Sequence, residues 1–268
     1  MTHESPLGKS TTYSSQYDPE LLFAISRAES RRKLDFGADL PFTGWDIWNA
    51  WELTWLNAGG VPQVAMVEIR VPATSPKIIE SKSLKLYCNS FCMTAFESIA
   101  DVRSAIRNDL GRLTESDVEV SLTTATGESP VEEFQGQCID SVDTKCNIYT
   151  VDASLLRSGG ETVSNALHSH LLRSLCPVTD QPDIGSVLVS YRGPRIDRAS
   201  LLQYIVSYRE HNDFHEACVE RMFVDILERC QPEALTVYAR YQRRGGIDIN
   251  PFRSNFESSP PNARLWRQ

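Results

Sequence analysis

The chain has 268 residues, 41% of them hydrophobic, and a formal net charge of −8 with an isoelectric point near 5.2. The hydrophobic fraction suffices for a folded core, and the negative net charge argues against direct binding to nucleic-acid phosphates. The first residues, MTHESPLGKSTTYSS, contain no apolar stretch of a signal peptide, and no run reaches the roughly 18 apolar residues of a membrane span. We therefore expect a cytoplasmic protein without a membrane partner.

The first forty residues are polar and are expected to form an N-terminal arm, in which SSQYDPELL indicates a short helix or turn. Ordered elements are expected to begin near Trp45. Two strands are predicted over residues 45–57 and 62–72, because the turn signal AGG separates two strand-like runs and the second run alternates apolar with charged residues.

Two helices and a strand are predicted next, over residues 83–91, 97–113 and 116–124. The second helix follows from apolar residues that recur at helical spacing, namely Ile99, Val102, Ile106 and Leu110.

A turn-rich, acidic stretch separates this first series from a second one. Strands are predicted over 168–175 and 185–194, helices over 201–211 and 215–230, and a final strand over 233–246. The segment HSHLLRSL, at 168–175, suits a short helix about as well.

Both halves run strand, strand, helix, helix, strand, which predicts an α+β fold of two modules, each an antiparallel sheet with helices on one face. The expected organisation is an arm over 1–40, a first module over 41–125, a linker or insertion over 126–160 and a second module over 161–268.

Cys176 begins a polar loop in SLCPVTDQPDIGS, and Asp183 lies seven positions later. A thiolate is a nucleophile, and a carboxylate able to pass a proton completes the minimum set for adding a thiol to an unsaturated carbon. The alternatives are a buried structural thiol and a turn or capping aspartate. The odd number of cysteines without C-x-x-C spacing favours reduced thiols, and the other six are expected to be structural.

His215 and Glu216 open the predicted helix after HND, so Asp213 is the expected N-cap. Glu216 suits a guanine-like edge, because one carboxylate accepts two hydrogen bonds from a ring N–H and an exocyclic amine. Phe214 can supply an apolar wall for such a ring. The alternative is that these are ordinary polar residues of the first turn of a helix, without a ligand.

Two basic segments are candidates for ligand phosphates. Lys82 and Lys85 lie three apart at a predicted helix start, and RRGGIDINP joins Arg244 to Gly245. The alternatives are a solvated helix face and a hairpin turn with exposed charges. Neither segment is a Walker loop, and no G-x-G-x-x-G follows a strand.

His168 and His170 lie two apart on a predicted strand and so share a face, which is compatible with a zinc site that has Cys176 as a third candidate ligand. No second closely spaced ligand pair exists in the sequence, so no metal is expected.

Six segments in order carry a family resemblance: LGKSTTYSSQYDPELL, DIWNAWELTWLN, ESKSLKLY, SLCPVTDQPD, HNDFHE and RRGGIDINP. Together they closely resemble the long, bimodular form of the 7-cyano-7-deazaguanine reductases, the QueF nitrile reductases of queuosine biosynthesis. Each segment alone is weak, and the resemblance rests on their order over nearly the whole chain.

The resemblance implies two tandem tunnelling-fold modules in a homodimer. It also implies a four-electron reduction of the nitrile of 7-cyano-7-deazaguanine to the amine of 7-aminomethyl-7-deazaguanine, with NADPH as cosubstrate. The product enters tRNA only later, so the enzyme handles a free base and needs no direct contact with nucleic acid.

Carried onto this sequence, Cys176 resembles the nucleophile that forms a covalent thioimide, and Asp183 resembles the proton donor. Glu216 resembles the residue that fixes the deazaguanine edge, His215 its neighbour that assists proton delivery, and Phe214 the residue that packs on the base.

The signature segment ESKSLKLY adds further implied contacts. Its substrate-facing part is matched by Ile79, Glu80 and Ser81. The NADPH contacts are matched by Ser81, Lys82, Arg244 and Gly245.

Other functions compete with this reading. A nitrile or amide hydrolase would use Cys176 with His215 and would not need Lys82 or Arg244. A second alternative is a binding module for pterin or deazapurine bases that has lost catalysis. A scaffolding role is the weakest, because the polar motifs lie at loop and helix starts and not on an apolar docking face.

Overall fold

The computed structural model describes residues 13–34, 39–124 and 131–268. The first twelve residues of the expected arm, and the expected module boundary after residue 125, lie outside these ranges. The chain divides into two compact units that interleave in sequence. Unit 1 comprises residues 1–33, 46–129 and 243–248, and unit 2 comprises 34–45, 130–242 and 249–268. The predicted four-part division of the chain stays a prediction.

The arm contains more order than its polar sequence predicts. The short helix expected in SSQYDPELL is present as η1 (Pro19–Leu21), and it is followed by β1 (Ala24–Ser26) and α1 (Arg27–Arg31). The expectation that ordered elements begin near Trp45 is therefore wrong. The reason is tertiary: Arg27 forms a buried ion pair with Asp46 at 2.5 Å, which fixes an otherwise polar segment.

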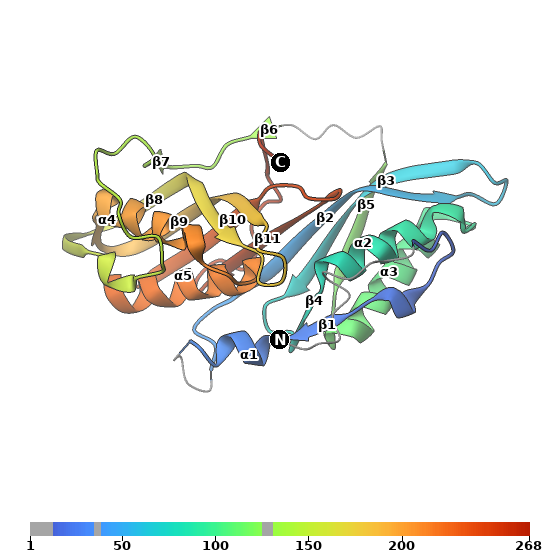
Figure 1. Cartoon of the computed structure of the whole chain (residues 1–268), viewed down its shortest axis with the longest axis horizontal. Coiled ribbons are helices and arrows are strands. Elements are labelled where there is room, and N and C mark those ends of the chain that lie inside the picture. Colours follow the sequence, from blue (N-terminus) through green and yellow to red (C-terminus); the bar gives the residue numbers. More distant parts are fainter. Residues whose placement is uncertain (1–12, 35–38, 125–130) are drawn as a thin grey trace. The chain divides into compact units, whose positions relative to one another are not determined.

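Unit 1 is built on three long strands and two helices. Its strands β2 (Thr43–Leu56), β3 (Pro62–Pro72) and β5 (Glu119–Thr124) follow in the order β5, β3, β2, with β3 and β5 antiparallel. The remaining elements are β4 (Lys77–Ile79), α2 (Ser81–Ser90), η2 (Phe91–Met93) and α3 (Ile99–Thr114). Figure 1 shows α2 beside α3, and a hydrogen bond of 2.7 Å from the Tyr87 hydroxyl to Asp109 joins them.

Unit 2 contains a mostly antiparallel sheet in the order β11, β10, β9, β8, β7. Only the pairing of β7 with β8 is parallel. The five strands are β7 (Gln137–Cys138), β8 (Ser158–Leu175), β9 (Pro182–Ile196), β10 (Ala234–Tyr241) and β11 (Ile247–Ser254). A separate parallel pair joins β6 (Val131–Glu132) to β12 (Arg264–Leu265).

Helices α4 (Arg198–Val206) and α5 (His215–Cys230) cover this sheet, with the short turns η3 (Ala153–Leu155) and η4 (Ser207–Glu210) beside them. The Tyr204 hydroxyl of α4 donates to Asp225 of α5 over 2.6 Å. Helix α5 is fixed to the sheet by a buried ion pair between Glu220 and Arg253 at 2.8 Å. Breaking such a buried ion pair costs free energy, so the pair fixes the position of α5 on the sheet.

The predicted α+β class, with antiparallel sheets and packed helices, is confirmed, and so are the strands and helices predicted in both halves. HSHLLRSL is a strand, as the end of β8. The predicted final strand over 233–246 is wrong in extent. It ends at Tyr241, because Gly245 and Gly246 adopt positive φ angles of 64° and 80° and turn the chain into β11. Among the described residues, no helix has the length and apolar character to cross a membrane.

Candidate active site

The loop that begins at Cys176 is the turn of a β-hairpin between β8 and β9. In this ladder Ser174 lies opposite Asp183, and the Cys176 N–H donates to the carbonyl of Gln181 over 2.9 Å. Asp180 adopts a left-handed φ of 55°, which aspartate tolerates better than most residues and which lets so short a loop close. Cys176 and Asp183 are both about 95% buried. The hairpin therefore holds the thiol and the carboxylate at one end of the same pair of strands.

The chain segment before α5 is tied to this hairpin. The Leu175 N–H donates to the His211 carbonyl over 2.8 Å, and the Leu175 carbonyl accepts from the Asp213 N–H over 3.2 Å. The Asn212 side-chain amide donates to the Asp180 carboxylate over 2.6 Å. Two backbone hydrogen bonds and one side-chain hydrogen bond thus place the start of α5 close to Cys176, the residue after Leu175.

Asp183 and His215 form a close acid–base pair. The His215 Nε2 lies 3.3 Å from an Asp183 carboxylate oxygen, and both side chains are about nine-tenths buried. The His215 ring stacks on Tyr241, with centroids 3.9 Å apart and an interplanar angle of 16°. Stacking fixes the ring orientation, and a carboxylate so close to an imidazole can exchange a proton with it. Asp183 and His215 are therefore placed so that they can pass a proton to a bound molecule.

Glu216 occupies the second position of α5 and is 3% exposed. The N-cap is Phe214, which makes no side-chain capping bond, so the prediction of Asp213 as the N-cap is wrong. Asp213 lies one residue too early for that role, and its carboxylate accepts the Phe214 N–H over 2.9 Å. Phe214 itself is half-buried. The first turn of α5 therefore presents Phe214, His215 and Glu216 together.

Two residues of this cluster escaped the sequence analysis. Tyr241, which supports His215, comes from the end of β10, and no sequence pattern connects it with the hairpin. Cys218 lies three residues after His215, and this helical spacing was the available signal. Burial raises the pKa of the Cys218 thiol well above its usual range, and the carboxylates of Asp213 and Asp183 act in the same direction. Burial thus favours the protonated form of this thiol, in keeping with the structural role expected for Cys218.

The signature segment in unit 1 has a different local structure. Ile79 is buried in β4, opposite Ala24 of β1. Glu80 is the N-cap of α2, and its two carboxylate oxygens accept the N–H groups of Lys82 at 2.7 Å and Ser83 at 2.8 Å. Burial raises the pKa of the Glu80 carboxyl, and these two backbone donors oppose the shift.

Ser81 and Lys82, both half-buried, form the first turn of α2. Arg244 and Gly245 lie in the turn between β10 and β11, where the Arg244 N–H donates to the Ile247 carbonyl over 2.8 Å. The sequence alternative of a hairpin turn is thus correct for the backbone of this segment.

A cavity of about 290 Å³ in unit 1 lies where this turn faces α2. Gly245 lines it, and so does Lys85, whereas Lys82 and Arg244 do not. A Cβ atom at Gly245 would lie 3.1 Å from the Lys85 Cε, so the glycine permits the close approach of this lysine. Asn89, one turn further along α2, also lines the cavity and was missed by the sequence analysis. The spacing of Lys85 and Asn89, four residues apart on a helix, was the usable signal.

The two histidines of HSH lie close together, but Cys176 is not with them. Among the described residues, the sulfur of Cys138 and one ring nitrogen each of His168 and His170 lie within 4.8 Å of one another. Burial lowers the pKa of His170, and the Asp140 carboxylate acts in the opposite direction. The cysteine beside these histidines is Cys138 and not Cys176, because residue 138 lies opposite His168 in the pairing of β7 with β8.

Two family models and the curated relatives match this chain. A family model described as the N-terminal part of the nitrile reductase 7-cyano-7-deazaguanine reductase matches residues 13–122, and a model described as QueF-like protein matches residues 182–260. The NADPH-dependent 7-cyano-7-deazaguanine reductase of Paraburkholderia xenovorans is 53% identical over 99% of this chain and 98% of the relative. Its namesake from Burkholderia vietnamiensis is 52% identical over 98% of each chain.

A solved structure, that of the archaeosine synthase QueF-Like in the apo form, is 16% identical and covers 38% of this chain and 99% of its own, with a TM-score of 0.32. The full-length identity to the curated relatives is decisive: the chain belongs to the family of NADPH-dependent 7-cyano-7-deazaguanine reductases, which are oxidoreductases. The names of these relatives state NADPH dependence and mention no metal.

Proposed function

We propose that this protein reduces the nitrile of 7-cyano-7-deazaguanine to the primary amine of 7-aminomethyl-7-deazaguanine, at the expense of two molecules of NADPH, in the biosynthesis of queuosine. The observation that carries the proposal is the hairpin that holds Cys176 and Asp183 at one strand end, with His215 in contact with the Asp183 carboxylate. Such a set can add a thiolate to a nitrile and protonate the product.

The first step is covalent capture by Cys176. The thiolate attacks the nitrile carbon, a C–S bond forms, and the electron pair of one C≡N π bond moves to nitrogen. Asp183, paired with His215, delivers the proton that nitrogen then takes. The product is a thioimide, whose C=N carbon is more electrophilic than that of the nitrile.

NADPH supplies a hydride to the carbon in each of two reductions, and a proton accompanies each hydride. Between the reductions the Cys176–carbon bond breaks, the thiolate leaves with the bonding electrons, and the protonated imine that remains releases one proton to give the imine. His215, in contact with Asp183, is suited to pass a proton to nitrogen in the second reduction. Burial of both side chains keeps competing water away from the imine.

The base is bound by the first turn of α5. The buried carboxylate of Glu216 accepts hydrogen bonds from the ring N–H and the exocyclic amine of the deazaguanine, and Phe214 packs on the ring. Ile79, Glu80 and Ser81 supply further substrate contacts from the signature segment.

NADPH is bound through Ser81, Lys82, Arg244 and Gly245. The turn fits a phosphate group, because Gly245 and Gly246 have no side chains and a Cβ added at Gly246 would meet nothing within 4 Å. The guanidinium of Arg244 suits a phosphate by its planar set of donors, and the neighbouring Gly245 lines a cavity that holds a second cation, Lys85. We further propose a cytoplasmic homodimer that acts on the free base without binding nucleic acid.

The test is NADPH oxidation by the reduced protein with a limiting amount of 7-cyano-7-deazaguanine. We expect two NADPH per nitrile, no oxidation by Cys176→Ala, and normal oxidation by Cys146→Ser, a half-buried thiol outside the cluster. A protein that binds the base but oxidises no NADPH would contradict the proposal, and release of ammonia in its place would indicate hydrolysis.

A further inference from the structure

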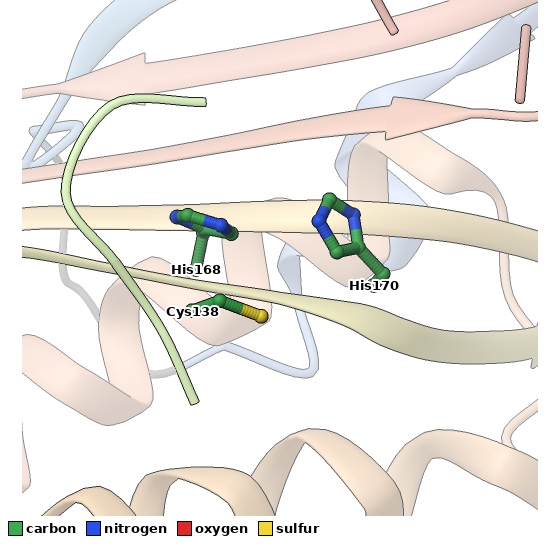
Figure 2. A group of neighbouring side chains, drawn as sticks. All are labelled: Cys138, His168 and His170. Atoms are coloured by element: carbon green, nitrogen blue, oxygen red, sulfur yellow. The ribbon is translucent and has the colours of Figure 1, made fainter. Parts of the chain in front are cut away.

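The cluster of Cys138, His168 and His170 lies apart from the residues assigned to the reduction. In Figure 2 the two imidazole rings follow each other along β8, and the sulfur of Cys138 lies between them in this view. The ligand atoms lie within 4.8 Å of one another, and the two ring centroids are 5.2 Å apart. Sulfur and imidazole nitrogen are the donors that zinc prefers.

A β-bulge positions His170. The pairing of β8 with β9 shifts register between Ser169 and Leu172, at the point where His170 lies. Bulges of this kind redirect a side chain. The Nδ1 atom of His170 lies 2.8 Å from the hydroxyl of Ser186. This bond leaves Nε2 as the nitrogen available to a metal ion, and it is the outer contact that metal-binding histidines usually have.

His168 supplies an independent observation. The side chain is 7% exposed, and its Nδ1 atom is buried without a hydrogen-bond partner in the described part of the chain. The ring lies against Phe134, with centroids 6.0 Å apart. A buried nitrogen without a partner is costly, and a bound cation would remove that cost.

Cys138 closes the group from the edge of the sheet. It is exposed, it belongs to the two-residue strand β7, and it lies opposite His168 in the parallel pairing. The neighbouring charges are mixed. The Asp140 carboxylate accepts the His170 N–H over 3.0 Å, and the Arg267 guanidinium donates to the His170 carbonyl over 2.7 Å.

We propose that Cys138, His168 and His170 bind one zinc ion, with water in the fourth position. The open position follows from the exposure of Cys138, because three protein ligands with a water are the usual composition of an open zinc site. In a tetrahedral site the ligand atoms lie about 3.3–3.6 Å apart, so atoms now as far as 4.8 Å from one another must approach by about 1 Å on binding. Zinc would replace the thiol proton and fix residues 137–140 to β8.

The site is tested with Co²⁺, whose bond to a thiolate gives a charge-transfer absorption band. Chelator-treated wild-type protein is expected to bind one equivalent per chain with this band, and Zn²⁺ is expected to displace the cobalt. Cys138→Ser should lose the band. Cys146→Ser, which removes another unit 2 thiol, and Cys176→Ala, which removes the proposed nucleophile, should both keep it. The exposed position of Cys138 makes its serine variant suitable, because the fold does not depend on that side chain.

Affinity measurements distinguish the metal ligands from the residues that orient them. We expect His170→Asn to weaken Zn²⁺ binding by at least about 100-fold and Ser186→Ala by about 10-fold, the range known for outer contacts. Zn²⁺ should also raise the melting temperature of the wild type but not that of Cys138→Ser.

A band that persists in Cys138→Ser, or one that disappears in Cys176→Ala, would overturn the proposal, and so would the absence of saturable binding. Because Cys176→Ala is predicted to keep the metal while it loses turnover, failure of this site and failure of the proposed reduction are distinguishable.

Discussion

Each unit places a buried glutamate at the start of a helix, but the two glutamates are used differently. Glu80 is 1% exposed and caps α2, with both carboxylate oxygens bonded to backbone N–H groups of its own helix. Glu216 is 3% exposed and lies one position inside α5, whose N-cap, Phe214, makes no side-chain bond.

The difference teaches that burial and residue type do not by themselves identify a binding carboxylate. A glutamate at the capping position has its acceptor capacity directed to the helix, whereas one inside the first turn projects from it. The start of α5 also has the Cys176 hairpin against it, so chemistry is expected there. The start of α2 is expected to contribute a helix cap, together with the substrate and cofactor contacts proposed for the signature segment.

The largest effect that would sharpen this contrast is expected at Asp183. Asp183→Asn keeps the shape of the side chain but cannot deliver a proton, so we expect thioimide formation to slow by about 10²–10⁴-fold. Rapid mixing with 7-cyano-7-deazaguanine and mass spectrometry of the adduct on Cys176 measures this rate. Asp180→Asn, in the same loop, is the matched control. Adduct formation at the wild-type rate in Asp183→Asn would remove Asp183 from the role of proton donor.

The second effect concerns Glu216. Glu216→Ala removes hydrogen bonds to a charged acceptor, each worth about 1.5–3 kcal/mol, so the deazaguanine should bind about 100-fold more weakly. Calorimetric titration of the base into the variant measures the affinity. Glu220→Ala is unsuitable as a control because Glu220 holds Arg253, and Glu228→Ala, further along α5, is preferred. Equal affinity in Glu216→Ala and the wild type would break the contrast.

The third effect concerns the cofactor. Arg244→Ala and Lys82→Ala should each raise the KM for NADPH about 10-fold, with a smaller change in kcat, because they remove single charge-assisted contacts to phosphate. Steady-state kinetics at saturating base measures both constants. Arg243→Ala is the informative neighbour, since the Arg243 guanidinium lies over the Trp51 ring at 4.2 Å. The same rise in KM in all three variants would argue for a loss of structure and against specific contacts.

The smallest effect is a change in stability. Glu80→Ala removes the cap of α2 and should lower the free energy of unfolding by about 0.5–2 kcal/mol. Glu216→Ala removes no cap and should cost less. Thermal or urea unfolding of both variants measures the difference. If Glu216→Ala proves the more destabilising of the two, the capping role assigned to Glu80 does not account for the difference between the two glutamates.

Much of the fold follows from local patterns. Alternation of apolar and charged residues predicted β3, and helical spacing predicted α3. Val102, Ile106 and Leu110 are buried, which confirms the predicted core-facing side of α3. Ile99, which shares that spacing, is 39% exposed because it begins the helix. β1 was missed because it has only three residues and pairs with the distant strand β4. β11 was missed because its polar residues and Pro251 do not form an apolar strand pattern, although all eight of its residues are buried.

The candidate site divides in the same way. The proximity of Cys176 and Asp183 is local, since both belong to one hairpin, and the sequence predicts it. Cys138 and His168 are joined only by the order of strands in the sheet, and Tyr241 meets His215 only because α5 packs against β10. The N-cap of α5 was misplaced by one residue, which is the usual uncertainty of a helix boundary.

The hairpin also bears on how the protein becomes active as it folds. Because only six residues separate Cys176 from Asp183, the entropy lost in closing that loop is small, and the two groups can meet as soon as β8 and β9 pair. His215 belongs to a later segment and arrives only when α5 docks. The proposed nucleophile and proton donor are thus brought together by a short-range contact, while the position of His215 depends on the assembled unit.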